Sequence, residues 1–123
     1  EPWWRAPEEM VPEAEGSPAR RITEAVDVYS LGNVLYLLLT GLEPRGKEKK
    51  KERYQIVSSI VASGARPTLP EFYALSDLPP VVALRKAVFR CYEPNPALRP
   101  TAMEIAQDLF AALNTREKHF TAS

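Results

Sequence analysis

The sequence predicts an all-α protein with one small core, and three observations support this. Apolar residues recur at helical spacing in several segments, whereas no segment alternates apolar and polar residues as a half-buried strand does. Twelve prolines lie mostly between these segments, where they end helices without breaking them. The chain has 123 residues, of which 45% are hydrophobic, so it is long enough to bury one core.

Residues 24–40 form the strongest predicted helix. Thr23 is a suitable N-cap, Asp27 lies near the positive end of the helix dipole, and Gly41 is a suitable C-terminal stop. From Leu31 onward the helix is apolar on nearly every side. This pattern predicts a helix at the centre of the core, with neighbours all round it.

Shorter elements are predicted on both sides of this helix. Pro7 opens a single helical turn over residues 8–11. A short amphipathic helix ends near Gly64, and residues 65–80, with four prolines, are predicted to form an ordered loop. The apolar stripe of the short helix is Ile56, Val57, Ile60 and Val61.

Two further helices are predicted near the C-terminus. Residues 80–92 have apolar side chains on one face and basic side chains on the other. Thr101 and Glu104 form a capping box that opens the last helix, because each side chain can satisfy a backbone donor at the other residue. The apolar face of this last helix is formed by Ala102, Ile105, Ala106, Leu109, Phe110 and Leu113.

Composition excludes several classes of function. Sixteen basic and sixteen acidic residues cancel, so no overall field favours nucleic acid or an anionic membrane. The single cysteine, Cys91, excludes a disulfide within the chain and favours a cytoplasmic location. The most apolar run, residues 34–39, is far shorter than the ~20 residues that cross a bilayer. A membrane anchor elsewhere in a longer protein stays open.

The residues for catalysis and metal binding are absent from the sequence. The one histidine, His119, lies near the C-terminus, so neither a serine nor a cysteine hydrolase triad is expected. One His and one Cys far apart do not make a metal site, and no Gly-rich phosphate-binding loop occurs. We therefore expect no catalytic, cofactor-binding or metal-binding residue in this chain.

Three segments, in order, resemble motifs of eukaryotic-type protein kinases. Trp4-Arg5-Ala6-Pro7-Glu8 resembles the Ala-Pro-Glu motif that closes the activation segment. Asp27-Val28-Tyr29-Ser30-Leu31-Gly32 is similar to the start of the family's central buried helix, with Tyr29 in place of the usual Trp. Residues 94–101 resemble the Pro-x-x-Arg-Pro-Thr motif before its last helix. The resemblance covers residues 1–113, as a partial kinase domain, and leaves residues 114–123 as a C-terminal tail.

The resemblance implies a fold and three structural residues. The fold is the helical C-lobe subdomain of a kinase, with a central buried helix surrounded by others. Glu8 and Arg99 match the family's buried structural ion pair, which ties two distant segments together. Asp27 matches the family aspartate that supports the catalytic loop by accepting its backbone hydrogen bonds.

The resemblance also implies a function for a larger protein. The parent would transfer the ATP γ-phosphate to protein Ser or Thr, with Tyr less favoured, and ATP and Mg²⁺ would bind only in the intact domain. This part alone would be inactive, because the family's ATP-binding and catalytic motifs have no counterpart in it. Its partners would be the rest of the kinase domain and a protein substrate or regulator, which a basic run could dock. The residues of that run are Lys47, Lys49, Lys50, Lys51 and Arg53.

Two alternatives have no catalytic role. Glu1 stands where Ser/Thr kinases usually have Thr, three residues before the aromatic of the Ala-Pro-Glu motif, and this favours a pseudokinase or scaffold. The other alternative is an independent helical interaction module whose motifs match by coincidence.

Overall fold

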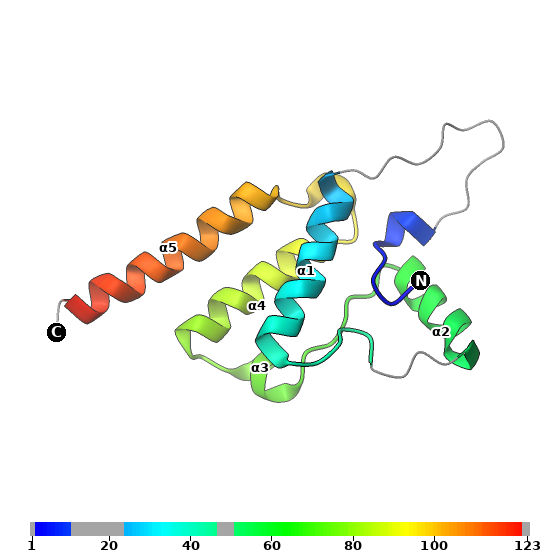
Figure 1. The fold of residues 1–123 in the computed structure, drawn as a ribbon, viewed down its shortest axis with the longest axis horizontal. Coiled ribbons are helices and arrows are strands. Elements are labelled where there is room, and N and C mark those ends of the chain that lie inside the picture. The colour runs from blue at the N-terminus through cyan, green and yellow to red at the C-terminus, as the bar shows by residue number, and fades with distance from the viewer. Residues whose placement is uncertain (1, 11–23, 47–50, 122–123) are drawn as a thin grey trace.

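The computed structural model describes residues 2–10, 24–46 and 51–121, and every regular element in these ranges is a helix (Figure 1). The all-α prediction is therefore confirmed. None of the helices in these ranges is long and apolar enough to span a membrane. The elements are the short 3₁₀ helices η1 (Pro7–Met10) and η2 (Pro96–Leu98) and the α-helices α1 (Glu24–Thr40), α2 (Lys51–Ala62), α3 (Glu71–Leu75), α4 (Pro79–Cys91) and α5 (Ala102–Thr121).

Helix α1 has the predicted bounds in the structure. Gly41 follows it with φ 72°, a left-handed conformation that favours glycine, and its N–H donates to the Leu37 carbonyl at 2.8 Å. This is the predicted C-terminal stop. The predicted N-cap, Thr23, lies outside the described residues.

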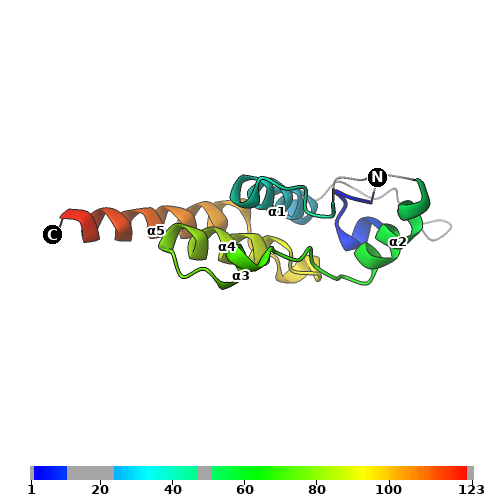
Figure 2. The same ribbon diagram turned by 90° about the horizontal axis from the view of Figure 1, so that it is seen from below.

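The main core lies where α1 packs along α4, with the start of α5 against the other side of α4 (Figures 1 and 2). Tyr92 and Cys91 at the end of α4 pack closely against Gly32 of α1. A Cβ at Gly32 would come within 2.8 Å of the Cys91 Cβ, so only glycine permits this approach. Burial raises the pKa of the Cys91 thiol to about 11, which keeps it neutral at physiological pH. The buried residues of this core are Ala6, Val28, Tyr29, Leu35, Tyr36, Ala87, Val88, Cys91, Tyr92 and Ile105.

A second, smaller core joins α2 to the N-terminal segment, at the end of the molecule opposite to α5 (Figure 2). Trp3 packs here against Val57 and Val61. Only half of the predicted stripe of α2 is used, because Ile56 and Ile60 remain 58% and 43% exposed. The described residues therefore form two hydrophobic clusters.

Helix α3 differs from the sequence prediction of a loop over residues 65–80. It is five residues long and begins directly after Pro70, so it is too short to produce a helical period in the sequence. Arg85 of α4 holds its C-terminal end by donating from Nη1 to the carbonyls of Tyr73 and Ser76, both at 2.8 Å.

The capping box at the start of α5 is confirmed. The Glu104 N–H donates to Thr101 Oγ1 at 3.1 Å, and the Thr101 N–H donates to Glu104 Oε1 at 3.3 Å. The predicted apolar face of this helix is only partly covered, however. Ile105 is buried, whereas Phe110 and Leu113 are more than half exposed.

Among the described residues, α1 has neighbours on only part of its surface. Val34, Leu37 and Leu38 are 51%, 41% and 72% exposed, although they lie in the middle of the most apolar helix. The reason is that α4 covers one side of α1 and no described helix covers the opposite side. This face of α1 is large enough to pack against a further element.

The close contact at Gly32 gives a stability prediction. We expect Gly32→Ala to destabilise the chain by about 1–3 kcal/mol, because the overpacked methyl group outweighs the ~1 kcal/mol gain in helix propensity. Ser30→Ala, at an exposed position of the same helix, is the matched control and should change the free energy of unfolding by less than about 0.5 kcal/mol. Urea denaturation followed by circular dichroism measures both. A Gly32→Ala variant as stable as the Ser30→Ala variant would contradict this packing.

Candidate functional site

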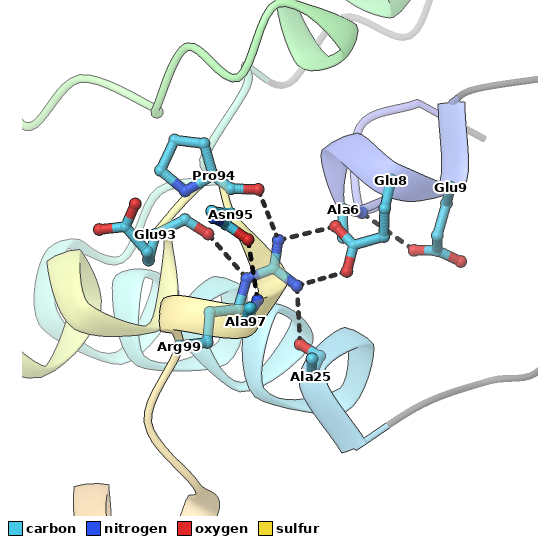
Figure 3. A network of polar contacts seen from close by, with 9 residues as sticks. All are labelled: Ala6, Glu8, Glu9, Ala25, Glu93, Pro94, Asn95, Ala97 and Arg99. Atoms are coloured by element: carbon cyan, nitrogen blue, oxygen red, sulfur yellow. Dashed lines mark hydrogen bonds and ion pairs between the residues drawn. The ribbon is translucent and has the colours of Figure 1, made fainter.

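The guanidinium group of Arg99 lies at the junction of three chain segments (Figure 3). Its side chain is fully buried, and it makes a bidentate ion pair with the Glu8 carboxylate at 2.6 and 2.7 Å. The remaining donors go to backbone carbonyls: Nη1 to Ala25 at 2.9 Å, Nε to Glu93 at 2.7 Å and Nη2 to Pro94 at 3.2 Å. All five N–H donors of the arginine are therefore used.

The short helix η1 presents Glu8 to this arginine. The Ala6 N–H donates to Glu9 Oε1 at 2.9 Å, while the Glu9 N–H donates to the Ala6 carbonyl at 3.0 Å, so the two residues close the turn reciprocally. The neighbouring Pro7 lacks a donor and has a fixed φ, which suits the first position of a helix. The Glu8 side chain is 26% exposed, so the ion pair is buried on the arginine side and open on the carboxylate side.

The loop before α5 orients Arg99. Asn95 caps η2 by accepting the Ala97 N–H on its Oδ1 at 3.0 Å. Arg99 follows this turn in an extended conformation with φ −69° and ψ 140°. The next residue, Pro100, favours that conformation, since a residue before proline is disfavoured in the helical region.

A second set of polar contacts extends the network across α1. The Arg99 guanidinium carbon lies 5.0 Å from the centre of the Tyr29 ring, a distance typical of a cation–π contact. The Tyr29 ring packs in turn against Tyr92, whose hydroxyl donates to Asn33 Oδ1 at 2.6 Å. Burial raises the pKa of Tyr92, so its hydroxyl stays protonated and remains a donor. The Asn33 side chain donates to the Trp4 carbonyl at 3.0 Å.

The Tyr29 hydroxyl also makes a hydrogen bond with an arginine in the turn after α1. It accepts a hydrogen bond from Arg45 Nη2 at 2.9 Å, and the same nitrogen donates to the Ala65 carbonyl at 2.7 Å. The Trp that the family pattern has at this position could only donate a hydrogen bond, so Tyr29 allows a contact with arginine that Trp would not. Tyr29 therefore links the arginine at the junction to the chain that leads out of α2.

The structure brings two of the three predicted structural residues together. Glu8 and Arg99 form the ion pair described above, although they are separated by 91 positions in the sequence. Asp27 is on the exposed side of the first turn of α1, away from that pair. Its predicted partner, a catalytic loop, is not part of the described residues, so its role stays a prediction.

The predicted basic docking run is only partly described. Lys47, Lys49 and Lys50 lie outside the described residues, and Lys51 is the first residue of α2. Arg53 is half-buried on α2. Among the described residues no group of three or more His, Cys, Asp or Glu side chains could hold a metal ion.

Sequence reasoning missed Asn33, Tyr92 and Arg45 as members of the network. Asn33 could have been found, because a polar side chain in the middle of an apolar helix needs a hydrogen-bonding partner when it is buried. Arg45 carried no such signal, since an arginine in a polar turn is ordinary surface composition. The described contacts around Arg99 hold distant segments of the chain in place.

Residues 1–111, which include the whole network around Arg99, match the family described as the protein kinase domain. The chain belongs to this family. It is 38% identical over 95 residues to the "probable serine/threonine-protein kinase PkwA" of Thermomonospora curvata, which is 77% of this chain and 11% of that protein. It is 30% identical over 108 residues to the dual specificity protein kinase shkA of Dictyostelium discoideum, covering 88% of this chain and 18% of that kinase.

A further kinase, the mitogen-activated protein kinase kinase kinase mkh1 of Cytospora mali, is 30% identical over 105 residues, 84% of this chain and 5% of that kinase. The chain spans less than a fifth of the length of each of these three kinases. It is thus a part of a kinase domain, and the family implies ATP, Mg²⁺ and protein substrates for the intact domain.

The geometry at Arg99 predicts strong energetic coupling between Glu8 and Arg99. We expect Arg99→Ala to lower the free energy of unfolding by about 3–5 kcal/mol, with Glu8→Ala toward the lower end because its side chain is partly exposed. In a double-mutant cycle the coupling should exceed ~1 kcal/mol. Urea denaturation of the four proteins measures it.

The surface ion pair between Arg90 and Asp108 is the matched control for this cycle. Both side chains are about half exposed, so water screens the pair and its coupling should stay within about 0.2–1 kcal/mol. If the effects of Glu8→Ala and Arg99→Ala simply add, the two residues are not coupled, and the proposed role of Arg99 is wrong.

Proposed function

We propose that the protein containing this chain transfers the γ-phosphate of ATP to serine or threonine of a protein substrate. This chain supplies the surface on which the substrate docks and the scaffold beneath the catalytic loop. It supplies no catalytic residue. The saturated guanidinium of Arg99 is the observation that carries the proposal. It fixes the Trp4–Glu8 segment against α1 and the loop before α5. A surface that positions a substrate has to be rigid in this way.

The exposed apolar face of α1 supports the scaffold part of the proposal. Val34 and Leu38 are more than half exposed in an otherwise core-like helix, which fits a helix that completes its packing with the rest of the kinase domain. Asp27 is exposed in the first turn of α1, with its carboxylate available to a neighbouring segment. We infer that it accepts backbone hydrogen bonds from the catalytic loop in the intact domain.

A phosphotransfer assay on the complete protein, with ATP, Mg²⁺ and Ser/Thr and Tyr peptides, tests this function. We expect transfer to Ser or Thr. Asp27→Asn should lower kcat by roughly 10–100-fold, because a displaced catalytic loop misaligns the reacting groups. Glu24→Gln, in the same exposed first turn, is the matched control and should leave kcat unchanged. Neither substitution should change the free energy of unfolding by more than about 0.5 kcal/mol.

Glu1 favours a second candidate, a pseudokinase or scaffold that binds partners without catalysis. It stands where Ser/Thr kinases usually have Thr, so substrate docking near the activation segment would differ. A folded complete protein without turnover on any peptide would support this candidate and rule out the catalytic proposal. Robust turnover would rule out the scaffold-only function.

A further inference from the structure

A groove lies at the end of the molecule that carries the second core. Its walls are the C-terminal end of α1, the turn over residues 41–46, one side of α2 and residues 66–68, and its volume is about 820 Å³. Tyr36 at its base donates a hydrogen bond from its hydroxyl to the Thr68 carbonyl at 2.6 Å, which holds the two walls together. The shape of the groove is therefore fixed by contacts within the fold.

The charge of this groove is positive. Among the described residues, three arginines, Arg45, Arg53 and Arg66, line it against one carboxylate, Glu43, so the formal charge of this lining is 3 − 1 = +2 in a chain with no net charge. Arg53 packs against Gly46, whose φ of 95° permits the tight turn that brings this guanidinium in. Such a concentration of arginine in a concave site is the usual means of recognising carboxylate or phosphate groups.

Two of these arginines have N–H groups that make no hydrogen bond to another described residue. Arg45 is anchored through Nη2 alone, so Nε and Nη1 donate to no acceptor among the described residues. Arg66 lies 3.6 Å from Glu93 Oε2, beyond hydrogen-bond distance, and its guanidinium carbon is 5.9 Å from the centre of the Phe89 ring. Both can therefore donate to a ligand without giving up an existing hydrogen bond.

The groove also has apolar walls open to a ligand. Leu42 and Ile60 line it and are 52% and 43% exposed. A small anion such as free phosphate would leave this apolar surface uncovered. A peptide that carries both carboxylates and an apolar side chain would complement both features.

We propose that this groove binds an acidic segment of a partner protein, with an apolar side chain against Leu42 and Ile60 and carboxylates at Arg45 and Arg66. The balanced charge of the whole chain disfavours nucleic acid and anionic membranes, both of which bind extended basic surfaces. The proposal deepens the docking role proposed above. It does not require phosphoryl transfer, so the two proposals fail independently.

Fluorescence anisotropy tests this, with the 123-residue chain and a fluorescein-labelled peptide in which glutamates flank a central leucine. We expect binding that weakens as salt rises from about 0.05 to about 0.5 M, because salt screens exposed charges. Arg66→Ala should lower the affinity about fivefold, which is ~1 kcal/mol for a solvent-exposed ion pair. Ile60→Ala should lower it without reducing the salt dependence.

Three controls make the outcome specific. Lys86→Ala removes one positive charge from an exposed position on α4, outside this groove, and should leave the affinity unchanged. Arg66→Lys keeps the charge and should retain most of the binding. Circular dichroism confirms that each variant is folded.

Several results would overturn the inference. One is equal binding of a peptide with lysine in place of glutamate, and another is unchanged affinity in the Arg66→Ala variant. The absence of binding by a folded chain would also reject it. If the glutamate peptide without its leucine bound at full affinity, the groove would be a site for simple anions. The proposed peptide recognition would then be wrong.

Discussion

The structure depends on one buried arginine whose every donor is occupied. Desolvating a guanidinium is unfavourable, and the loss is recovered only when the geometry provides an acceptor for each N–H. The side chain of Arg99 meets this condition with one carboxylate and three carbonyls from three parts of the chain. If any of these segments moves, the arginine loses an acceptor in a buried site. This constraint places the N-terminal turn, the start of α1 and the loop before α5 relative to one another.

Polar contacts in the network around Arg99 also join the two separate hydrophobic clusters. The cluster at α1 and α4 and the cluster at α2 meet through polar contacts, among them the Asn33 side chain on the Trp4 carbonyl and Arg45 on the Ala65 carbonyl. Hydrogen bonds of this kind add little net stability but fix geometry, since a mispaired arrangement leaves buried groups unsatisfied. The groove with three arginines shares one of these contacts, because Arg45 lines it.

The sequence predicts those parts of the arrangement that follow from local rules. The bounds of α1 and the capping box at Thr101 and Glu104 follow from helical period and backbone donors, and both are as predicted. Helix α3 could not be predicted, because five residues give no period. The half-covered faces of α1 and α5 could not be predicted either, because an apolar pattern does not say which residues supply the neighbours. The partnership of Glu8 with Arg99 required the family motifs, since no local rule links residues 91 positions apart.

The central claim is that Arg99 joins η1, which packs against α2, to the rest of the chain. Native-state hydrogen exchange on Arg99→Lys tests it most directly. Lysine keeps the positive charge but lacks the planar fork, so it satisfies fewer of these acceptors. The amides of α2 and η1 should lose more protection than those of α4, because the junction opens locally before the main core does. Equal loss of protection in α2 and α4, or none in either, would contradict the claim.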